Sequence, residues 1–202
     1  MPGKTVLITG FEPFDGDTFN ASWQAVRPLD GLVMSEHVIR AICLPVTFAD
    51  APVQLLQHID DLDPAFVICV GEAREREVVS LEQIACNLID ARLADNTGTR
   101  PVNEPVVAGG PADHRSTLPL TDILTVLGQA GIAAELSQSA GTFVCNATFY
   151  ALMDLAKDRR GLRAGFIHIP AFRDELRVEA MTGALRIAIT TTIARSGTST
   201  HA

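Results

Sequence analysis

The sequence predicts a three-layer α/β/α sandwich with a mostly parallel, mixed central sheet. Short runs rich in aliphatic and β-branched residues alternate along the chain with amphipathic stretches of helical length. This alternation is typical of a sheet covered by helices on both faces. Several of the β-rich runs, such as residues 66–70, are continuously apolar, which indicates central strands without a solvent-facing side.

The first quarter of the chain predicts two strands and two helices. Thr5–Thr9 is the first strand, and Asn20–Val26 is a helix opened by an Asn side chain, a favoured N-cap. His37–Cys43 is the second strand. Ala49–Ile59 follows as a helix, because it places four aliphatic side chains on one side.

The middle of the chain is less regular. Ala65–Val70 and Glu82–Leu88 are predicted strands, and Thr121–Ala130 is a helix with Thr-Asp capping chemistry that stops at Gly131. Residues 71–80 and 90–116 do not fit the alternation. Loops of this length in a compact domain are usually functional or disordered.

The last third returns to the regular pattern. Ala133–Ser137 and Gly165–Ile169 are predicted strands, and Cys145–Lys157 and Glu175–Ala194 are predicted helices. Residues 196–202 are expected to be a frayed tail.

Length and composition favour one domain, residues 1–202, with a substantial core. The net charge of −8 and the lack of a Lys/Arg run argue against nucleic acid or an anionic membrane as partner. The hydrophobic content of 47% suggests that some surface is buried against another copy. The amino-terminal run is too short for a signal peptide or a membrane span, so we expect a cytoplasmic protein.

The four cysteines show no Cys-x-x-Cys pairing and no nearby histidine partner, so no metal site is expected. Gly71-Glu72 follows a predicted strand, but neither G-x-G-x-x-G nor the P-loop pattern is present nearby. A nucleotide is therefore disfavoured, and no cofactor is expected.

Cys145 lies where a Gly-Thr loop gives way to a predicted helix. The helix dipole and its unpaired N–H groups should lower the pKa of a thiol there. His168, at the end of a predicted strand, could act as acid and base, and Glu82, expected at the start of a strand, could orient it. From spacing alone, a structural role for these three residues is equally compatible, and Phe11 and Phe14 could simply pack in the core.

Several motifs carry a resemblance to a known family. They are Val6-Leu-Ile-Thr-Gly-Phe-Glu-Pro-Phe-Asp-Gly16, Asp90-Ala-Arg-Leu-Ala-Asp-Asn96, Ala140-Gly-Thr-Phe-Val-Cys-Asn146 and Gly165-Phe-Ile-His-Ile-Pro170. In order and over nearly the full chain, they resemble the pyroglutamyl peptidase I (pyrrolidone-carboxylate peptidase) family. The resemblance implies a cysteine exopeptidase that removes N-terminal pyroglutamate from peptides through a thioester, needs no cofactor, and forms dimers or tetramers.

The same resemblance implies roles for individual residues. Cys145 aligns with the nucleophile, His168 with the general acid/base and Glu82 with the third member of a triad. Arg92 aligns with an arginine close to the active site that could assist the oxyanion. The pocket for the lactam ring is implied at Phe11, Phe14, Glu72, Phe143 and Val144.

The chain departs from the family pattern in two places. Glu72, Arg74 and Glu75 replace a glutamine and two glycines after the third strand, and Gln83 stands where an arginine commonly follows the triad glutamate. Positive φ would be costly at the former glycine positions. These departures leave two alternatives: a cysteine amidase of the same fold for another small N-acyl group, and a non-catalytic binding protein on the peptidase scaffold.

Overall fold

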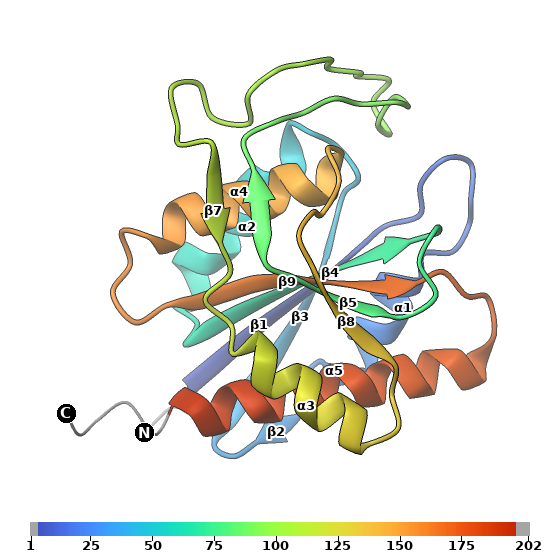
Figure 1. Cartoon of the computed structure of the whole chain (residues 1–202), viewed down its shortest axis with the longest axis vertical. Coiled ribbons are helices and arrows are strands. Elements are labelled where there is room, and N and C mark those ends of the chain that lie inside the picture. Colours follow the sequence, from blue (N-terminus) through green and yellow to red (C-terminus); the bar gives the residue numbers. More distant parts are fainter. Residues whose placement is uncertain (1–3, 197–202) are drawn as a thin grey trace.

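A single mixed sheet lies at the centre of the computed structural model, which describes residues 4–196 (Figure 1). Across the sheet the strands are β2 (Val33–Met34), β3 (His37–Leu44), β1 (Lys4–Phe11), β4 (Phe66–Ala73), β9 (Arg163–Pro170), β5 (Val79–Glu82) and β8 (Ala134–Ser137). Strands β3, β1, β4 and β9 are mutually parallel. The edge strand β2 is antiparallel to β3, and β5 is antiparallel to β9 and parallel to β8.

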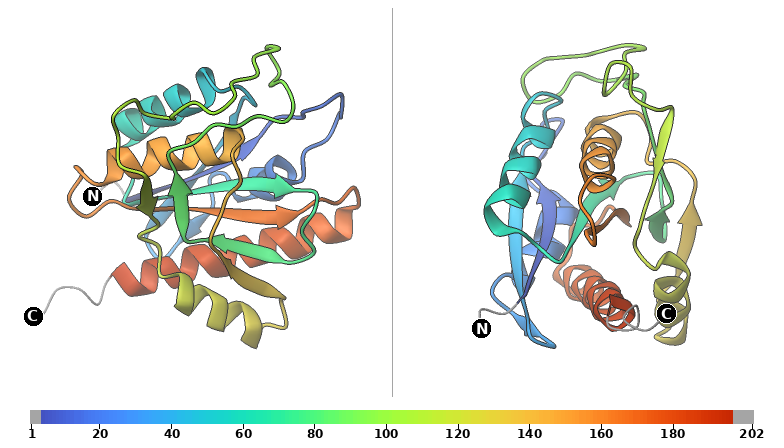
Figure 2. Two further views of the ribbon diagram at one scale, coloured as in Figure 1. Left: turned by 45° about the horizontal axis from the view of Figure 1, so that its top comes forward. Right: turned by 90° about the vertical axis from the view of Figure 1, so that its left-hand side faces the viewer.

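Helices cover both faces of the sheet (Figure 2). On one face lie α2 (Asp50–Leu62) and α4 (Val144–Ala156), and on the other lie α1 (Ala21–Val26), α3 (Leu120–Gln129) and α5 (Glu175–Ser196). A short 3₁₀ helix, Arg27–Leu29, follows α1. Each face has its own buried apolar cluster. The predicted three-layer fold with a mostly parallel, mixed sheet is confirmed.

Most predicted elements are present with boundaries shifted by a few residues, but the predicted strand Glu82–Leu88 is wrong. The chain breaks at Gln83: β5 ends at Glu82 inside the main sheet, and β6 (Ile84–Cys86) pairs with β7 (Asp113–Arg115) in a separate two-stranded sheet. Gln83 donates its N–H to Ser137 and accepts the N–H of Ser116. It therefore links the two sheets, and Glu82 ends a strand rather than starting one.

Two helix details also differ from the sequence prediction. Helix α3 begins at Leu120, and its N-cap is Pro119 with no side-chain hydrogen bond, so Thr121 does not cap it. Asn20, by contrast, caps α1 as predicted by accepting the N–H of Ser22. Of the tail expected at 196–202, only Ser196 lies within the described residues, where it ends α5.

The segment between β6 and β7, residues 87–112, makes a long excursion on the α4 side of the molecule (Figure 1). It is folded back on itself by a β-bridge between Ile89 and Glu104. Asp95, buried within it, accepts hydrogen bonds from the N–H groups of Phe48, Thr97 and Thr99. The bond from Phe48 fixes the excursion to the loop before α2, and the other two close a turn within the excursion.

The helices of the described chain include none with the length and apolar character needed to cross a bilayer.

Candidate active site

Cys145 is the second residue of α4 and is half-buried. The N-cap of this helix, Phe143, makes no side-chain capping bond, and the first N–H groups of a helix have no partner within it. The next residue, Asn146, is buried. Its side-chain amide accepts the N–H of Cys86 and donates to the carbonyls of Cys86 and Leu88. Asn146 thus fixes the start of α4 against β6.

His168 and Glu82 are brought together by the register of two antiparallel strands. Glu82 on β5 lies opposite Phe166 on β9, and Ser80 lies opposite His168. Residues two apart on a strand share a face, so Glu82 and His168 are diagonal neighbours. His168 Nδ1 lies 2.7 Å from Glu82 Oε1, and both residues are buried.

The sulfur of Cys145 and the ring of His168 meet over Gly71 of β4. A methyl group added at Gly71 would lie 2.9 Å from Cys145 Sγ, from His168 Cδ2 and from Phe166 Cε1. Because Nδ1 is turned to Glu82, the ring edge that carries Cδ2 and Nε2 is the one on the sulfur side. The start of α4, the end of β9 and Gly71 therefore bring the thiol of Cys145 and the imidazole of His168 together.

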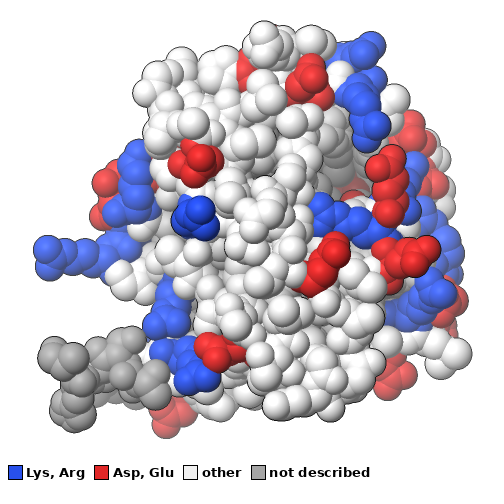
Figure 3. All heavy atoms as spheres, viewed as in Figure 1, with Lys and Arg blue, Asp and Glu red and all other residues white. Residues whose placement is uncertain are grey.

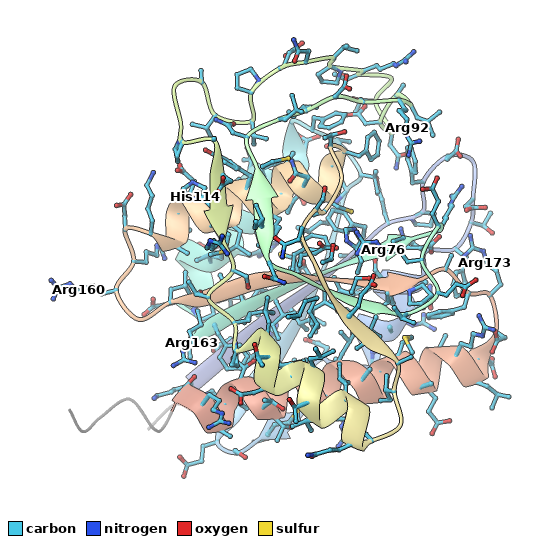
Figure 4. The ribbon with its side chains drawn as sticks, in the orientation of Figure 1. Arg76, Arg92, His114, Arg160, Arg163 and Arg173 are labelled. Atoms are coloured by element: carbon cyan, nitrogen blue, oxygen red, sulfur yellow. The ribbon has the colours of Figure 1, made fainter. Side chains whose placement is uncertain are left out.

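Arg76 is a site residue that the sequence analysis missed. Its guanidinium donates to Glu82 Oε1 at 2.7 Å and to the carbonyl of Ser139, in the loop before α4, at 2.7 Å. In Figure 4 Arg76 lies toward the centre of the molecule, whereas Arg92 and Arg173 lie nearer its edge. The only sequence signal was its place in the charge-rich run after β4, and such runs are usually solvated loops.

The pKa of the Cys145 thiol is raised, contrary to the prediction of a lowered pKa. Burial, and then the charge of Glu82, raise the pKa of Cys145 from 9.0 to about 12, and the hydrogen bond from its own backbone N–H lowers it by less. The helix start is therefore outweighed by loss of solvent and by the carboxylate behind His168. A thiol with a raised pKa needs a neighbouring base if it is to act as a nucleophile, and the imidazole of His168 lies beside it.

A pocket of about 360 Å³ opens in front of the thiol. Its inner wall is aromatic and aliphatic, with the ring centroids of Phe14 and Phe143 5.1 Å apart. Val144 and Phe11 are buried at the base of this wall, so all four apolar residues predicted for a ligand pocket line one cavity. This volume is at the lower end of the range for small-molecule pockets, about 300–1,000 Å³.

Glu72 also lines the pocket, but its carboxylate is engaged elsewhere. Oε2 accepts the N–H of Ala21 at 2.6 Å, and Oε1 and Oε2 face Arg74 and Arg173 at 3.6 and 3.4 Å. The negative charge of Glu72 is therefore compensated by one main-chain N–H and two arginines. Arg74 and Glu75 have negative φ, so the loss of two glycines causes no backbone strain.

Arg92 lines the outer edge of the same pocket. Its side chain is 87% exposed and lies 3.8 Å from Glu75, which is equally exposed. Within the described part of the chain Arg92 forms no hydrogen bond or ion pair with Cys145, His168 or Glu82, and it lies at the mouth of the site. Among the described residues no group of three or more His, Cys, Asp or Glu side chains is arranged to hold a metal ion.

Residues 4–197 match the family model described as pyroglutamyl peptidase. The chain belongs to the pyroglutamyl peptidase family. It is 48% identical to the pyrrolidone-carboxylate peptidase of Klebsiella pneumoniae over 82% of this chain and 77% of that protein. It is 43% identical to the pyrrolidone-carboxylate peptidase of Chromobacterium violaceum over 95% and 94% of the two chains.

Solved structures lead to the same family. The crystal structure of Bacillus amyloliquefaciens pyroglutamyl peptidase I matches with a TM-score of 0.91 at 39% identity, covering 96% of this chain and 98% of that one. A mutant pyrrolidone carboxyl peptidase from Pyrococcus furiosus matches with a TM-score of 0.90 at 33% identity, covering 95% and 99%. The chain is therefore a cysteine peptidase of this family, and neither the altered amidase nor the non-catalytic binding protein is favoured.

Proposed function

We propose that this cysteine omega-peptidase removes N-terminal pyroglutamate from peptides with Cys145 as nucleophile, His168 as general acid and base, and Glu82 as the group that orients His168. The observation that carries the proposal is the meeting of Cys145 Sγ and the His168 ring over Gly71, with Nδ1 bonded to Glu82. A base oriented by a third group beside a nucleophile is the arrangement that acyl transfer requires.

In the first half-reaction the sulfur attacks the carbonyl that joins pyroglutamate to the next residue, and the thiol proton passes to His168. The free N–H groups at the start of α4 can receive the oxyanion. The C–N bond then breaks, and His168 returns the proton to the departing amine. The products are a free peptide and a thioester on Cys145.

In the second half-reaction His168 takes a proton from water, which attacks the thioester carbonyl. The C–S bond breaks, pyroglutamate leaves as the acid, and the proton returns to the thiolate. The raised pKa of Cys145 fits this sequence, because the resting thiol is regenerated at the end of each cycle. All proton transfers use one imidazole.

The pocket supports recognition of the lactam. Pyroglutamate is a neutral five-membered ring without a free amine, so flat apolar walls suit it better than a charged group. Phe11, Phe14, Phe143 and Val144 supply such walls, and the carboxylate of Glu72 is turned toward Ala21 and two arginines. A peptide with a charged N-terminal amine would lose hydration there without gaining a partner.

Arg92 is proposed as a supporting residue that turns inward when substrate is present. Its exposed pairing with Glu75 at 3.8 Å stabilises the outward position by about 1 kcal/mol at most. A bound substrate with a developing oxyanion can offset that cost.

We further propose one catalytic domain that works in the cytoplasm as a homo-oligomer. The cysteines of the described chain are all free, which suits a reducing compartment. Figure 3 supports assembly, because the central part of the face it draws is almost without charged residues. Large exposed apolar side chains add to this support: Val33, Val53, Leu93, Val102 and Leu176. Light scattering of the purified chain should give a mass of two or four subunits, and a monomeric mass would reject assembly.

The decisive experiment is hydrolysis of a fluorogenic pyroglutamyl amide, compared with prolyl and acetyl amides of the same fluorophore. We expect turnover of the pyroglutamyl amide alone. Cleavage of another acyl amide without turnover of the pyroglutamyl amide would reject the proposed specificity.

Variants then test the residue roles. Cys145→Ala and His168→Ala should each abolish turnover while the cooperative unfolding transition in urea is retained. Cys43→Ala is the matched control, since Cys43 is a half-buried free thiol on β3 that does not line the pocket. Full activity in either catalytic variant would contradict the assigned roles.

A further inference from the structure

A tight turn carries one wall of the substrate pocket. Phe14 begins the turn Phe14–Asp17, closed by a hydrogen bond from the Asp17 N–H to the Phe14 carbonyl. Its two central residues, Asp15 and Gly16, have φ of 59° and 76°. Positive φ at a residue other than glycine is uncommon and has to be stabilised by its surroundings.

Arg74 contacts this turn at three points. Its guanidinium lies 3.2 Å from Asp15 Oδ2 and 2.6 Å from Asp17 Oδ2, and it donates to the Phe14 carbonyl at 3.4 Å. A guanidinium presents its donors in one rigid plane, so three such contacts restrict the turn far more than a single ion pair would.

Two further residues fix Arg74 in place. Glu72 Oε1 lies 3.6 Å from Arg74 Nε, and its Oε2 lies 3.4 Å from Arg173 Nη1. Arg173 also reaches Asp17 Oδ2 at 2.8 Å and stacks over the ring of Phe19 at 5.3 Å. Glu72 is only 7% exposed, whereas the other side chains of the network are 35–48% exposed. The network has a buried anchor at Glu72 and joins the loop after β1, the loop after β4 and the segment after β9.

We infer that Arg74 is a positioning residue for the lactam pocket, acting through the Phe14–Asp17 turn. The inference rests on the proposed function, because it takes the pocket beside Cys145 as the substrate site. Arg74 holds the turn, the turn holds the Phe14 ring 5.1 Å from that of Phe143, and these two rings form the apolar wall. Arg74 also lines the outer part of this pocket, but among the described residues it forms no hydrogen bond or ion pair with Cys145, His168 or Glu82.

This position in the molecule predicts an effect on binding without an effect on chemistry. Arg74→Met keeps most of the side-chain length but removes the charge and all donors. We expect KM for a pyroglutamyl amide to rise about 5- to 20-fold, since loss of a charge-assisted network of this kind loosens one wall of the pocket. The value of kcat should stay within about 2-fold, because the reacting groups are untouched.

Salt and a second substitution make the test more specific. The network is partly exposed, so salt should weaken it and KM of the unchanged protein should rise between 0.05 and 1 M NaCl. At 1 M the Debye length is about 3 Å, which is comparable to the distances between the paired charges. Arg74→Met should lose most of that dependence. Asp17→Asn should raise KM as well, and adding it to Arg74→Met should raise KM little further, because the two side chains act as one unit.

Arg177→Met is the matched control. Arg177 is an exposed arginine in the first turn of α5, and its Nε lies 3.7 Å from Oδ2 of Asp174, the residue before that helix. The Arg177→Met substitution should leave both KM and the salt dependence of KM unchanged. Arg74→Lys, which keeps the charge but not the planar donors, should give an intermediate KM.

The outcomes separate the two proposals. If the unchanged protein does not hydrolyse the pyroglutamyl amide, the proposed function fails. If it does, and Arg74→Met has an unchanged KM or a loss confined to kcat, the positioning role is overturned. If Arg74→Met does not fold, Arg74→Lys and Asp17→Asn decide the question by the same kinetic criteria.

Discussion

Replacing Gly71 by alanine should disable the site without unfolding the protein. The new methyl carbon would lie 2.9 Å from Cys145 Sγ, His168 Cδ2 and Phe166 Cε1. The optimal separation between such atoms is about 3.5–4.0 Å, so each of the three neighbouring atoms must move away by roughly 0.5–1 Å. Overpacking of this kind costs about 1–3 kcal/mol of stability. Separation of the thiol from the imidazole by a similar distance should lower kcat by about 100-fold.

The assay is kcat on a pyroglutamyl amide, measured alongside urea unfolding. Gly128→Ala is the control, because Gly128 lies in α3 with no heavy atom within 4 Å of the added carbon. It should leave kcat unchanged and raise the free energy of unfolding by about 0.5–1 kcal/mol through helix propensity. Undiminished kcat in Gly71→Ala would refute the claim that sulfur and ring meet over this glycine.

Three further predictions concern the charges and the thiol. Arg76→Met should lower kcat about 10- to 100-fold and the free energy of unfolding by about 1–3 kcal/mol, because the buried carboxylate of Glu82 loses a partner. The control is Arg186→Met, at an exposed position on α5, which should leave both kcat and stability unchanged. Because the pKa of Cys145 is raised to about 12, its alkylation by iodoacetamide without substrate should be slow at pH 7 and should accelerate about tenfold for each pH unit above it. Fast labelling at pH 7, followed by mass spectrometry, would contradict this. Burial raises the pKa of Asp95, but the hydrogen bonds from Phe48, Thr97 and Thr99 outweigh burial and lower that pKa below 3.8. The Asp95 carboxylate therefore stabilises the folded protein fully above pH 3.8. This contribution is lost as the pH falls through the lower pKa of the folded state. Asp95→Asn should therefore lower the free energy of unfolding in urea by about 1–3 kcal/mol at pH 7, and the difference from the unchanged protein should become smaller near pH 3. A difference that does not depend on pH would contradict the role of the charge.

The fold was largely predictable because its signals are local and repeated. Continuous apolar runs marked β1, β4 and β9, and the Asn20 cap marked α1. The break at Gln83 was not predictable, since both sides of it are apolar and the break is imposed by pairing with Ser116 and Ser137, far away in the chain. A strand that changes sheets leaves little trace in composition.

The sequence could predict the candidate site residues whose role depends on their position along a helix or strand. It could not predict those whose role depends on the direction of the side chain. Cys145 at a helix start and His168 near a strand end could be identified from sequence. Arg76 could not, because its role depends on turning inward to Glu82 while Arg74, two residues earlier, turns outward to Asp17. The pKa of the thiol was predicted in the wrong direction, because burial and the charge of Glu82 arise only in the folded chain.

The register of β5 against β9 separates the enzyme's chemistry from its choice of substrate. The carboxylate and the imidazole are spaced by main-chain hydrogen bonds between two interior strands, whereas the aromatic wall and the mouth belong to connecting segments. Lineages could therefore exchange residues in those segments, and so change which acyl group is accepted, while proton transfer stays intact. Variation in ligand range is expected to collect in loops 12–20 and 87–112 and in residues 74–78 apart from Arg76, which bonds to Glu82. The strand pair should tolerate very little.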